Sequence, residues 1–344
     1  MQAIHIPAFV KDPSALKPTT HPTPTPSPTR ILIHTTHVSP THVDLLYAQG
    51  LHQNNKRHAK PPFILGMDFA GTILSAPAIT GFRQGDSVYG SAAGGFAEYI
   101  SVDVSKGGTG GIRRVPDGWS RAGACAVGAS GAVGLGCFRA VGGVRKGEWV
   151  LVTGATGGLG CVAVQIARAM GGRVVALVGG AGAEEKERVI KALGVEACVR
   201  YDLEGWEERV KEVSGGGVDV VYDVVGMVES CLRCCAYEGR VVIVGFAGRG
   251  GDVERVRVNR VLLKSASVVG YRFGEQGRRK PEVVRRIWQD FDEMVARGGI
   301  VPVIYPKEYK SLAAVGAAMG DLARREVYGR AVIEVVEVEE QAKL

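Results

Sequence analysis

The residues best suited to chemistry in this chain are a run of glycines that follows an apolar segment. Val150 to Val152 have a buried-strand pattern, which leads into Gly154-Ala155-Thr156-Gly157-Gly158-Leu159-Gly160 and then into a helical pattern from Cys161. At such a turn, N–H groups at a helix N-terminus bind a dinucleotide pyrophosphate. Glycine suits the turn because a Cβ would block either the bend or the phosphates. The spacing Gly-x-x-Gly-x-x-Gly is looser than the usual fingerprint, so a merely tight strand-to-helix connection stays open.

The next strand pattern bears on which dinucleotide would bind. An NAD site places Asp or Glu at the end of its second strand, to hold the ribose 2′-hydroxyl. Here the pattern Gly172–Val178 is followed by Gly179-Gly180-Ala181-Gly182-Ala183. Lys186 and Arg188, with Tyr201, offer donors for a 2′-phosphate, so the sequence favours NADPH. The neighbouring glutamates leave open that the two cations belong to an ordinary solvated helix face.

The elements around these residues alternate between strand and helix. A helical pattern at Glu184–Leu193 precedes strand patterns at Ala197–Val199, Val218–Val225 and Arg240–Val244. This alternation predicts an α/β fold with a doubly wound parallel sheet. Ligands of such sheets lie beyond the carboxyl ends of the strands, so five loops should surround the cofactor. These loops are Gly154–Gly160, Gly179–Lys186, Tyr201, Gly226 and Gly245-Phe246-Ala247.

The N-terminal third has a different pattern. Short strand patterns, separated by turns with Pro or Gly, indicate a small irregular β-barrel; they lie at Ile4–Phe9, Arg30–Thr36, Phe69–Ser75, Ser87–Tyr89 and Phe96–Val102. An amphipathic pattern at Val283–Arg297 and a final strand pattern at Tyr328–Val335 come after the parallel-sheet region. We therefore expect residues 1–124 and 270–344 to form one domain, with residues 125–269 inserted as the nucleotide-binding domain.

Composition is that of a globular enzyme: 46% of residues are hydrophobic and 22% charged. The net charge of +7 is spread too widely for a nucleic-acid-binding stripe. No span approaches the roughly 20 apolar residues needed to cross a bilayer, and the first residues lack a signal-peptide pattern. A cytoplasmic location is expected.

The chain has seven cysteines, mostly in apolar contexts, which fits reduced thiols. The group Cys231-x-x-Cys234-Cys235, in a helical stretch, lacks a second ligand pair that could complete a zinc site.

Many motifs in order resemble one family over nearly the whole chain, the zinc-independent quinone oxidoreductases (zeta-crystallin-like proteins) of the medium-chain dehydrogenase/reductase superfamily. The resemblance lies in Phe63–Gly71, Gly85–Gly90, Gly94–Tyr99, Gly154–Gly160, Tyr222–Gly226, Val244–Ala247, Asn259–Lys264 and Gly329–Val332. It implies a GroES-like catalytic domain, a Rossmann domain, NADPH and a homodimer.

Zinc alcohol dehydrogenases share this fold, and a zinc site needs about three protein ligands. Where those enzymes have a His-Glu pair after glycine, this chain has Gly66-Met67-Asp68, and their four closely spaced cysteines are absent. His34, His37 and His42 have no neighbouring Cys, which is typical of ordinary polar histidines. We expect a metal-free enzyme, with Asp68 fixing a loop by hydrogen bonds rather than acting as a base.

Without a metal, the chemistry predicted is hydride transfer from NADPH to a quinone or a similar electron-poor acceptor. An enoyl or alkenal reductase and a non-catalytic NADPH-binding protein remain alternatives. The resembling proteins often have an Asn where this chain has Thr41, and commonly a Pro and a Thr in the stretch that matches Gly128–Val133. The substrate and the catalytic competence of this chain therefore stay open. Candidate substrate contacts are Thr41, Tyr47, Ser130 and Phe273, and Arg330 in the final strand is expected to face the cofactor.

Overall fold

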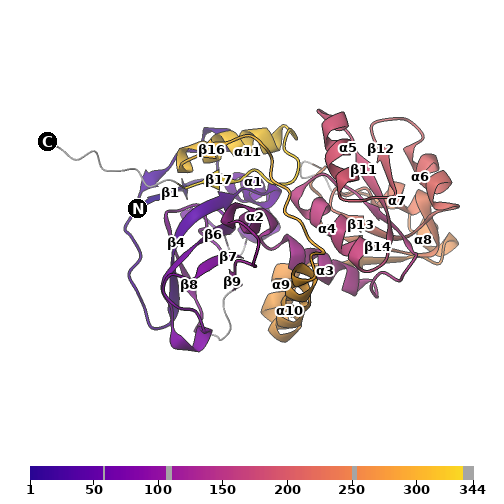
Figure 1. The fold of residues 1–344 in the computed structure, drawn as a ribbon. Coiled ribbons are helices and arrows are strands. Elements are labelled where there is room, and N and C mark those ends of the chain that lie inside the picture. The colour runs from indigo at the N-terminus through magenta and orange to yellow at the C-terminus, as the bar shows by residue number, and fades with distance from the viewer. Residues whose placement is uncertain (57–58, 106–110, 250–253, 336–344) are drawn as a thin grey trace. The chain divides into compact units, whose positions relative to one another are not determined.

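The computed structural model describes residues 1–56, 59–105, 111–249 and 254–335, and its chain divides into two compact units (Figure 1). The first, here called the β unit, comprises residues 1–129 and the chain from Pro302 onward. The second, the α/β unit, comprises Ser130–Val301. The α/β unit is therefore an insertion within the β unit, as the sequence predicted.

Within the described residues, the α/β unit contains a parallel six-stranded sheet in the order β12-β11-β10-β13-β14-β15. Its strands are β10 (Trp149–Val152), β11 (Arg173–Val178), β12 (Ala197–Arg200), β13 (Val218–Asp223), β14 (Cys235–Ile243) and β15 (Ser267–Gly270). β10 lies between β11 and β13 and is parallel to both. From β10, the strands β11 and β12 are added on one side of the sheet and β13, β14 and β15 on the other, so the strand order reverses between β10 and β13. This order is that of a Rossmann sheet, whose ligands bind beyond the strand ends at the reversal. The predicted fold class is confirmed.

Helices flank this sheet because its central strands are apolar on both faces. The side chains of Val150, Leu151 and Val152 are fully buried, as are those of Val174 and Val175. The helices described in the α/β unit are α3 (Ser130–Ala140), α4 (Gly158–Ala169), α5 (Ala183–Ala192), α6 (Trp206–Ser214), α7 (Val228–Cys234), α8 (Asn259–Leu263), α9 (Phe273–Arg279) and α10 (Pro281–Ala296). Of these, α10 packs on α3 and α9.

The C-terminal boundary of the α/β unit differs from the predicted one. The sequence pattern assigned residues 270–344 to the first domain, but the chain re-enters the β unit only at Pro302. The reason is that α10 packs on α3: a Cβ on Gly131 of α3 would lie 2.1 Å from the ring of Phe291 on α10. The N-terminal boundary also shifts, from residue 125 to Ser130, because α2 (Arg121–Val127) packs on strands of the β unit.

In the β unit, β4 (Arg30–Ser39) is central because it pairs with β6 (Asp68–Ser75), β8 (Tyr99–Asp103) and β17 (Ile333–Glu334). The remaining strands are β1 (Gln2–Ala3), β2 (His5–Ile6), β3 (Thr19–Thr20), β5 (Phe63–Ile64), β7 (Ser87–Ser91), β9 (Arg113–Arg114) and β16 (Tyr309–Lys310). Its other helices are α1 (His42–Gln49), α11 (Val315–Ala323) and the short 3₁₀ helices η1 (Pro13–Ala15), η2 (Gln53–Lys56), η3 (Ala78–Thr80) and η4 (Leu312–Ala314).

The end of the described chain returns to β4. Only Ile333 and Glu334 of the predicted strand form β17, antiparallel to Val38 and His37. Upstream of them, the Ser39 hydroxyl donates to the carbonyl oxygen of Ala331. The residues after Val335 lie outside the described part of the chain.

One helical stretch has the length and composition for a membrane span. Among the described residues, Arg121–Ala140 reaches 20 residues with apolar character, contrary to the expectation that no span approaches this length. Its most apolar window is 78% buried inside the fold, as in the core helices of folded domains.

The cysteines are also buried, apart from the partly exposed Cys198. Cys234 ends α7 and Cys235 begins β14, so the predicted helical stretch is shorter than expected.

Candidate functional site

The predicted glycine turn connects β10 to α4, and two of its glycines are required by the protein's own packing. Gly154 has a φ of +56°, in the left-handed region that glycine favours. A Cβ on Gly160 would lie 2.1 Å from the carbonyl oxygen of Gly154. The helix therefore approaches the turn too closely for any side chain at residue 160.

Gly157, by contrast, is not required by the protein's packing. It is the N-cap of α4 with a φ of −81°, and a Cβ there would meet its nearest protein atom at 3.5 Å, an ordinary contact distance. No side-chain hydrogen bond caps α4, so N–H groups of its first turn remain available to an anion. The glycine at 157 leaves space in front of these groups, which is the arrangement that a pyrophosphate needs.

The loop after β13 is organised by Asp223, a residue that the sequence analysis noted only as part of a family motif. Its side chain is fully buried, and it accepts hydrogen bonds from the Thr153 hydroxyl at 2.7 Å and from the N–H groups of Val225, Gly226 and Met227 at 3.0, 3.1 and 2.8 Å. Because Thr153 directly follows β10, this carboxylate joins the start of the glycine turn to the neighbouring strand β13.

The loops after β13 and β14 lie against each other. Gly226 has a φ of +87°, and a Cβ on it would lie 2.9 Å from the ring of Phe246. The N–H groups of Gly245 and Ala247 donate to the carbonyl oxygens of Asp223 and Val224. The structure thus brings the predicted residues Gly226, Gly245, Phe246 and Ala247 together at the carboxyl edge of the sheet.

The loop after β11 has the predicted glycines and no carboxylate among residues 179–183. Lys186, only 4% exposed, donates from Nζ to the carbonyl oxygen of Ala181 at 2.7 Å. The ring of Tyr201 lies against the same loop, 2.8 Å from the Cβ that Gly179 would carry. Lys186 and Tyr201 therefore both border this loop, whereas Arg188 pairs with Glu185 at 2.8 Å with its side chain 76% exposed, as on a solvated helix face.

An acidic residue that sequence reasoning missed also reaches this loop. Asp202 accepts a hydrogen bond from the N–H of Gly180 at 3.2 Å and forms two hydrogen bonds with Arg200, each 2.8 Å long. The hydrogen bonds from the Arg200 guanidinium hold the pKa of Asp202 well below its usual range. The negative charge of Asp202 is therefore balanced by the guanidinium of Arg200, the last residue of β12.

In the β unit, the candidate Thr41 is the N-cap of α1 and forms a capping box with Asp44. The N–H and Oγ1 of Thr41 donate to Oδ2 of Asp44 at 2.8 and 2.7 Å, and the N–H of Asp44 returns a hydrogen bond to Thr41 Oγ1 at 3.3 Å. Asp44 is fully buried, whereas Thr41 is partly exposed. Burial raises the pKa of Asp44 to about 7.

A second buried acid, Asp68, connects three distant segments. Its carboxylate lies 3.4 Å from the guanidinium of Arg330 and accepts hydrogen bonds from the N–H of Ala129 and from the side chain of Ser91. Burial raises the pKa of Asp68, and Arg330 opposes this shift. A Cβ on Gly128, whose φ is +47°, would lie 2.5 Å from Asp68. Asp68 thus fixes the chain at Gly128–Ala129, in agreement with its expected loop-fixing role.

Arg330 was expected to face the cofactor. Its guanidinium is instead engaged by Asp68 within the β unit, with its side chain 9% exposed. The ion pair lies beside the buried Asp44, whose pKa the charge of Arg330 lowers in part. A direct contact between Arg330 and a cofactor remains a prediction.

The other three substrate candidates have packing partners of their own. Tyr47 is partly buried, accepts a hydrogen bond from the Asn54 amide at 2.8 Å and stacks on His52 with ring centroids 4.4 Å apart. Ser130 begins α3 and is 1% exposed. Phe273 begins α9 and packs edge-on against Trp288 at 6.5 Å. Their contact with a substrate remains a prediction.

The histidines named in the sequence analysis make ordinary polar and ring contacts. His37 lies 3.0 Å from the hydroxyl of Thr36, and His34 is stacked on Tyr99 at 5.1 Å. Burial lowers the pKa of both His37 and His42. Across residues 1–56, 59–105, 111–249 and 254–335, no three His, Cys, Asp or Glu side chains gather as metal ligands would.

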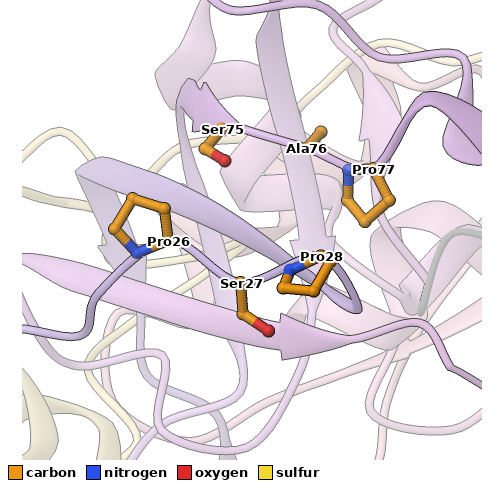
Figure 2. Close-up of a pocket in the computed structure, with 6 residues that line it drawn as sticks. All are labelled: Pro26, Ser27, Pro28, Ser75, Ala76 and Pro77. Atoms are coloured by element: carbon orange, nitrogen blue, oxygen red, sulfur yellow. The ribbon is translucent and has the colours of Figure 1, made fainter.

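A surface hollow of about 330 Å³ lies elsewhere on the β unit, between Pro26–Pro28 and Ser75–Pro77. Figure 2 shows the proline rings and two short serine side chains that line it. It shares no residue with the predicted sites and contains no titratable side chain. We assign it no chemistry.

Two family models match the chain, one in each unit. The alcohol dehydrogenase GroES-like domain matches residues 27–113, within the β unit. The zinc-binding dehydrogenase model matches residues 158–289, within the α/β unit. The observed sheets and the two matches therefore identify the same two domains.

Relatives extend the similarity over the whole chain. Quinone oxidoreductase-like protein 2 from Bos taurus is 30% identical over 334 residues, covering 95% of this chain and 91% of its own. Acryloyl-coenzyme A reductase from Sulfurisphaera tokodaii is 29% identical, covering 82% and 86%. A solved mycobacterial protein complexed with NADPH is 25% identical, with a TM-score of 0.83 and coverage of 97% and 99%. The chain therefore belongs to the quinone oxidoreductase-like branch of the medium-chain dehydrogenase/reductase superfamily.

Proposed function

We propose that this protein is an NADPH-dependent quinone oxidoreductase, which reduces a quinone or a similar electron-poor acceptor without a metal. The observation that carries the proposal is the glycine loop after β11, which has no carboxylate of its own and is bordered by Lys186 and Tyr201. A cation and a phenol at this position suit a 2′-phosphate, and an acid to hold the 2′-hydroxyl of NADH is missing from the strand end.

The residues present fit the dinucleotide. The uncapped first turn of α4 and the space in front of Gly157 suit its pyrophosphate, and the joined loops after β13 and β14 place Gly226 and Gly245–Ala247 along the same edge. When bound, NADPH supplies a hydride to the acceptor. The NADPH complex of the mycobacterial relative supports this choice of cofactor.

Quinones and α,β-unsaturated carbonyls both accept hydride readily, since the charge that develops lies on an oxygen. The similarity to quinone oxidoreductase-like protein 2 favours a quinone. The similarity to acryloyl-coenzyme A reductase supports the alternative of an enoyl or alkenal reductase. A third alternative is a non-catalytic NADPH-binding protein, which the Thr41 and Gly128–Val133 departures keep open.

One panel separates these functions. NADPH oxidation is followed with 9,10-phenanthrenequinone, 1,4-benzoquinone and a series of trans-2-enals, alongside fluorescence titration of NADPH binding. Higher kcat/KM for the quinones supports the main proposal, and higher kcat/KM for the enals supports the alternative. Tight NADPH binding without turnover on any acceptor contradicts both and supports the non-catalytic role.

The metal-free part of the proposal has its own test. We expect activity to survive exhaustive dialysis against EDTA or 1,10-phenanthroline, because the described residues do not supply three grouped ligands. Elemental analysis of the untreated protein is the matching measurement. A stoichiometric metal whose removal abolishes turnover would contradict the proposed mechanism.

A homodimer and a cytoplasmic location complete the proposal. β15 is an edge strand of the parallel sheet, and the side chain of its Val268 is 37% exposed. On α8, Leu262 is 79% exposed and Leu263 is 73% exposed. Exposed apolar residues beside an unpaired strand edge suit pairing with a second copy. Light scattering after size-exclusion chromatography tests the dimer, and a monomer at every concentration would contradict it. Cell fractionation tests the location.

A further inference from the structure

We propose that Thr41 and Asp44 form a proton relay, in which Thr41 protonates the oxygen of the acceptor and Asp44 supplies Thr41 with the replacement proton. This inference rests on the proposed reductase function and names the proton donor that the function requires. Hydride addition to a quinone or an enone leaves negative charge on an oxygen, and a positioned O–H group neutralises that charge most effectively.

The geometry separates the two roles. Thr41 Oγ1 lies 2.7 Å from Asp44 Oδ2, which is a short O–H···O hydrogen bond through which a proton can pass. Thr41 is partly exposed at the N-terminus of α1, whereas Asp44 is 0% exposed. Only Thr41 can therefore touch an acceptor, and Asp44 acts through it as the protected proton source.

The surroundings of Asp44 favour a neutral carboxylic acid. Both hydrogen bonds from Thr41 end on Oδ2, and buried Oδ1 has no hydrogen-bond partner among the described residues. A carboxylate with one bare oxygen away from water is costly, whereas a protonated one carries no charge. The pKa of about 7 that burial produces means that Asp44 can both hold and release a proton near neutral pH.

Of the nearby charges, Asp68 favours the protonated form of Asp44 and Arg330 opposes it. Asp68 on β6 and Arg330 act electrostatically on Asp44, and one cation faces two carboxyl groups. Asp68 has Arg330, the Ala129 N–H and Ser91 to stabilise its charge, so Asp44 is the member that keeps the proton. The other titratable group described on α1 is His42, which lies near Arg325. The helices α11 and η1 pack against α1. Asp321 of α11 binds Lys307, Tyr309 and Arg324, and Asp12 caps η1.

The proposed step balances. The acceptor gains a hydride from NADPH and a proton from Thr41 Oγ1. In the same step the hydrogen bond between Thr41 Oγ1 and Asp44 Oδ2 reverses: the carboxyl proton, carried on Oδ2, passes to Oγ1. The acceptor is reduced by two electrons, the nicotinamide is oxidised to NADP⁺, and Asp44 is left as a carboxylate in the field of Arg330. Water then returns the proton to Asp44 through the partly exposed Thr41 hydroxyl.

The family's usual residue supplies a matched control. The resembling proteins often have an Asn where this chain has Thr41, and Asn caps helices as well as Thr does. An Asn side chain donates hydrogen bonds but does not give up a proton. Thr41→Asn therefore preserves the cap and removes the relay, while Thr41→Ser preserves both.

The test measures kcat at saturating NADPH from about pH 5.5 to pH 9, in H₂O and D₂O, with 1,4-benzoquinone and a trans-2-enal. The variants are Thr41→Ser, Thr41→Asn, Thr41→Val and Asp44→Asn, with Tyr47→Phe to test the rival donor. Since general acid catalysis contributes typically 10²–10⁴-fold, we expect Thr41→Val to lower kcat about 100-fold and Thr41→Ser to stay within about fivefold of the original protein. NADPH affinity should stay within about twofold in every variant.

Asp44 is a positioning and proton-supplying residue, so its role is tested by the dependence of kcat on pH. In the unsubstituted protein, kcat should fall as the pH rises through about 7, because the acid form of Asp44 is lost. This fall and the solvent isotope effect should both disappear in Asp44→Asn and Thr41→Asn. An infrared carbonyl band of a protonated carboxylic acid should be present at pH 6, weaken by pH 8 and be missing from Asp44→Asn whether or not the enzyme turns over.

The outcomes separate two failures. An inactive unsubstituted protein contradicts the proposed function, and with it any relay. An active protein in which Thr41→Val or Thr41→Asn keeps full kcat, or in which Asp44→Asn keeps the fall near pH 7, contradicts the relay alone. A large loss in Tyr47→Phe with no loss in Thr41→Val would assign the proton donor to Tyr47 instead.

Discussion

Each unit contains a fully buried aspartate beside its candidate site, and the two are stabilised differently. In the α/β unit, Asp223 receives hydrogen bonds from one hydroxyl and three N–H groups, which reach both of its oxygens. In the β unit, Asp44 receives its hydrogen bonds from Thr41 on Oδ2, while Oδ1 has no hydrogen-bond partner within the described chain.

The difference separates a carboxylate that fixes a loop from a buried carboxyl group whose pKa is raised. Four donors to the Asp223 carboxylate fix the loop that joins β13 to α7. A carboxyl group with one bare oxygen gains by taking up a proton, as the raised pKa of Asp44 indicates. Four experiments test this comparison, from the largest expected effect to the smallest.

Removing the structural carboxylate should have the largest effect. Asp223→Ala leaves the Thr153 hydroxyl and three N–H groups without their acceptor, and we expect a loss of about 3–5 kcal/mol in the free energy of unfolding. NADPH binding should be lost as well, because the loop after β13 borders the cofactor edge. Urea denaturation and fluorescence titration measure both. A loss below about 1 kcal/mol would mean that the four hydrogen bonds do not hold this loop.

The titrating carboxylate should instead make stability depend on pH. The folded state holds the Asp44 proton up to about pH 7, whereas the unfolded chain releases it near the ordinary aspartate pKa of 3.8. Stability should therefore decrease as the pH rises between these values, by on the order of 2–4 kcal/mol, and the loss should level off above pH 7.

The matched variant isolates this contribution. Asp44→Asn does not ionise, so its stability relative to the unsubstituted protein should improve from about pH 4.5 to about pH 7 and level off above that, in parallel urea titrations. The other ionisable groups are common to both proteins and cancel in the difference. Parallel stability curves would show that Asp44 does not titrate in this range.

The third experiment applies the comparison to a buried cation. Lys186→Met removes the ammonium that borders the loop after β11, and a lost charge-assisted contact to phosphate costs about 1.5–3 kcal/mol. NADPH affinity should fall by roughly 10- to 150-fold, with NADH affinity unchanged. Arg188→Met is the control, because Arg188 is exposed and paired with Glu185. Calorimetry that finds equal losses for both variants, or for both cofactors, would contradict the assignment.

The smallest effects separate the two uses of glycine in the turn. Gly160→Ala forces a Cβ against the backbone of Gly154 and should destabilise the protein by about 1–3 kcal/mol. Gly157→Ala fits the backbone, and its gain in chain entropy is offset by the loss of a favoured N-cap residue. The stability of the unliganded protein should therefore change by less than about 1 kcal/mol, while NADPH binding should weaken. Thermal unfolding with and without NADPH measures both. Unchanged NADPH affinity in Gly157→Ala would remove the argument that its space serves the pyrophosphate.

Sequence reasoning was most successful where structure depends on neighbouring residues. The predicted strand at Gly172–Val178 and the helix at Glu184–Leu193 match β11 and α5 within a residue or two, because apolar periodicity and glycine turns act locally. The capping box of Thr41 and Asp44 could also have been found, since Thr-x-x-Asp before an apolar run is a known N-terminal signal.

Contacts between distant segments were not predictable in this way. Asp68 and Arg330 come from opposite ends of the β unit, and no spacing in the sequence relates them. The misplaced boundary at residue 270 has a similar cause, because the amphipathic pattern of α10 does not say which apolar face will cover it. Asp202 was overlooked because its role depends on Gly180, in a loop that follows a different strand.

The insertion of the α/β unit also sets an order of events during synthesis. Asp44 and Asp68 emerge from the ribosome early, whereas Arg330 and β17 follow only after the whole of Ser130–Val301. Until then, Asp44 and Asp68 lack the cation of Arg330, and β4 lacks its pairing with β17 at His37 and Val38. Completion of the β unit is a late, long-range step of high contact order, and this step, rather than the Rossmann sheet, should limit how quickly the newly made chain becomes active.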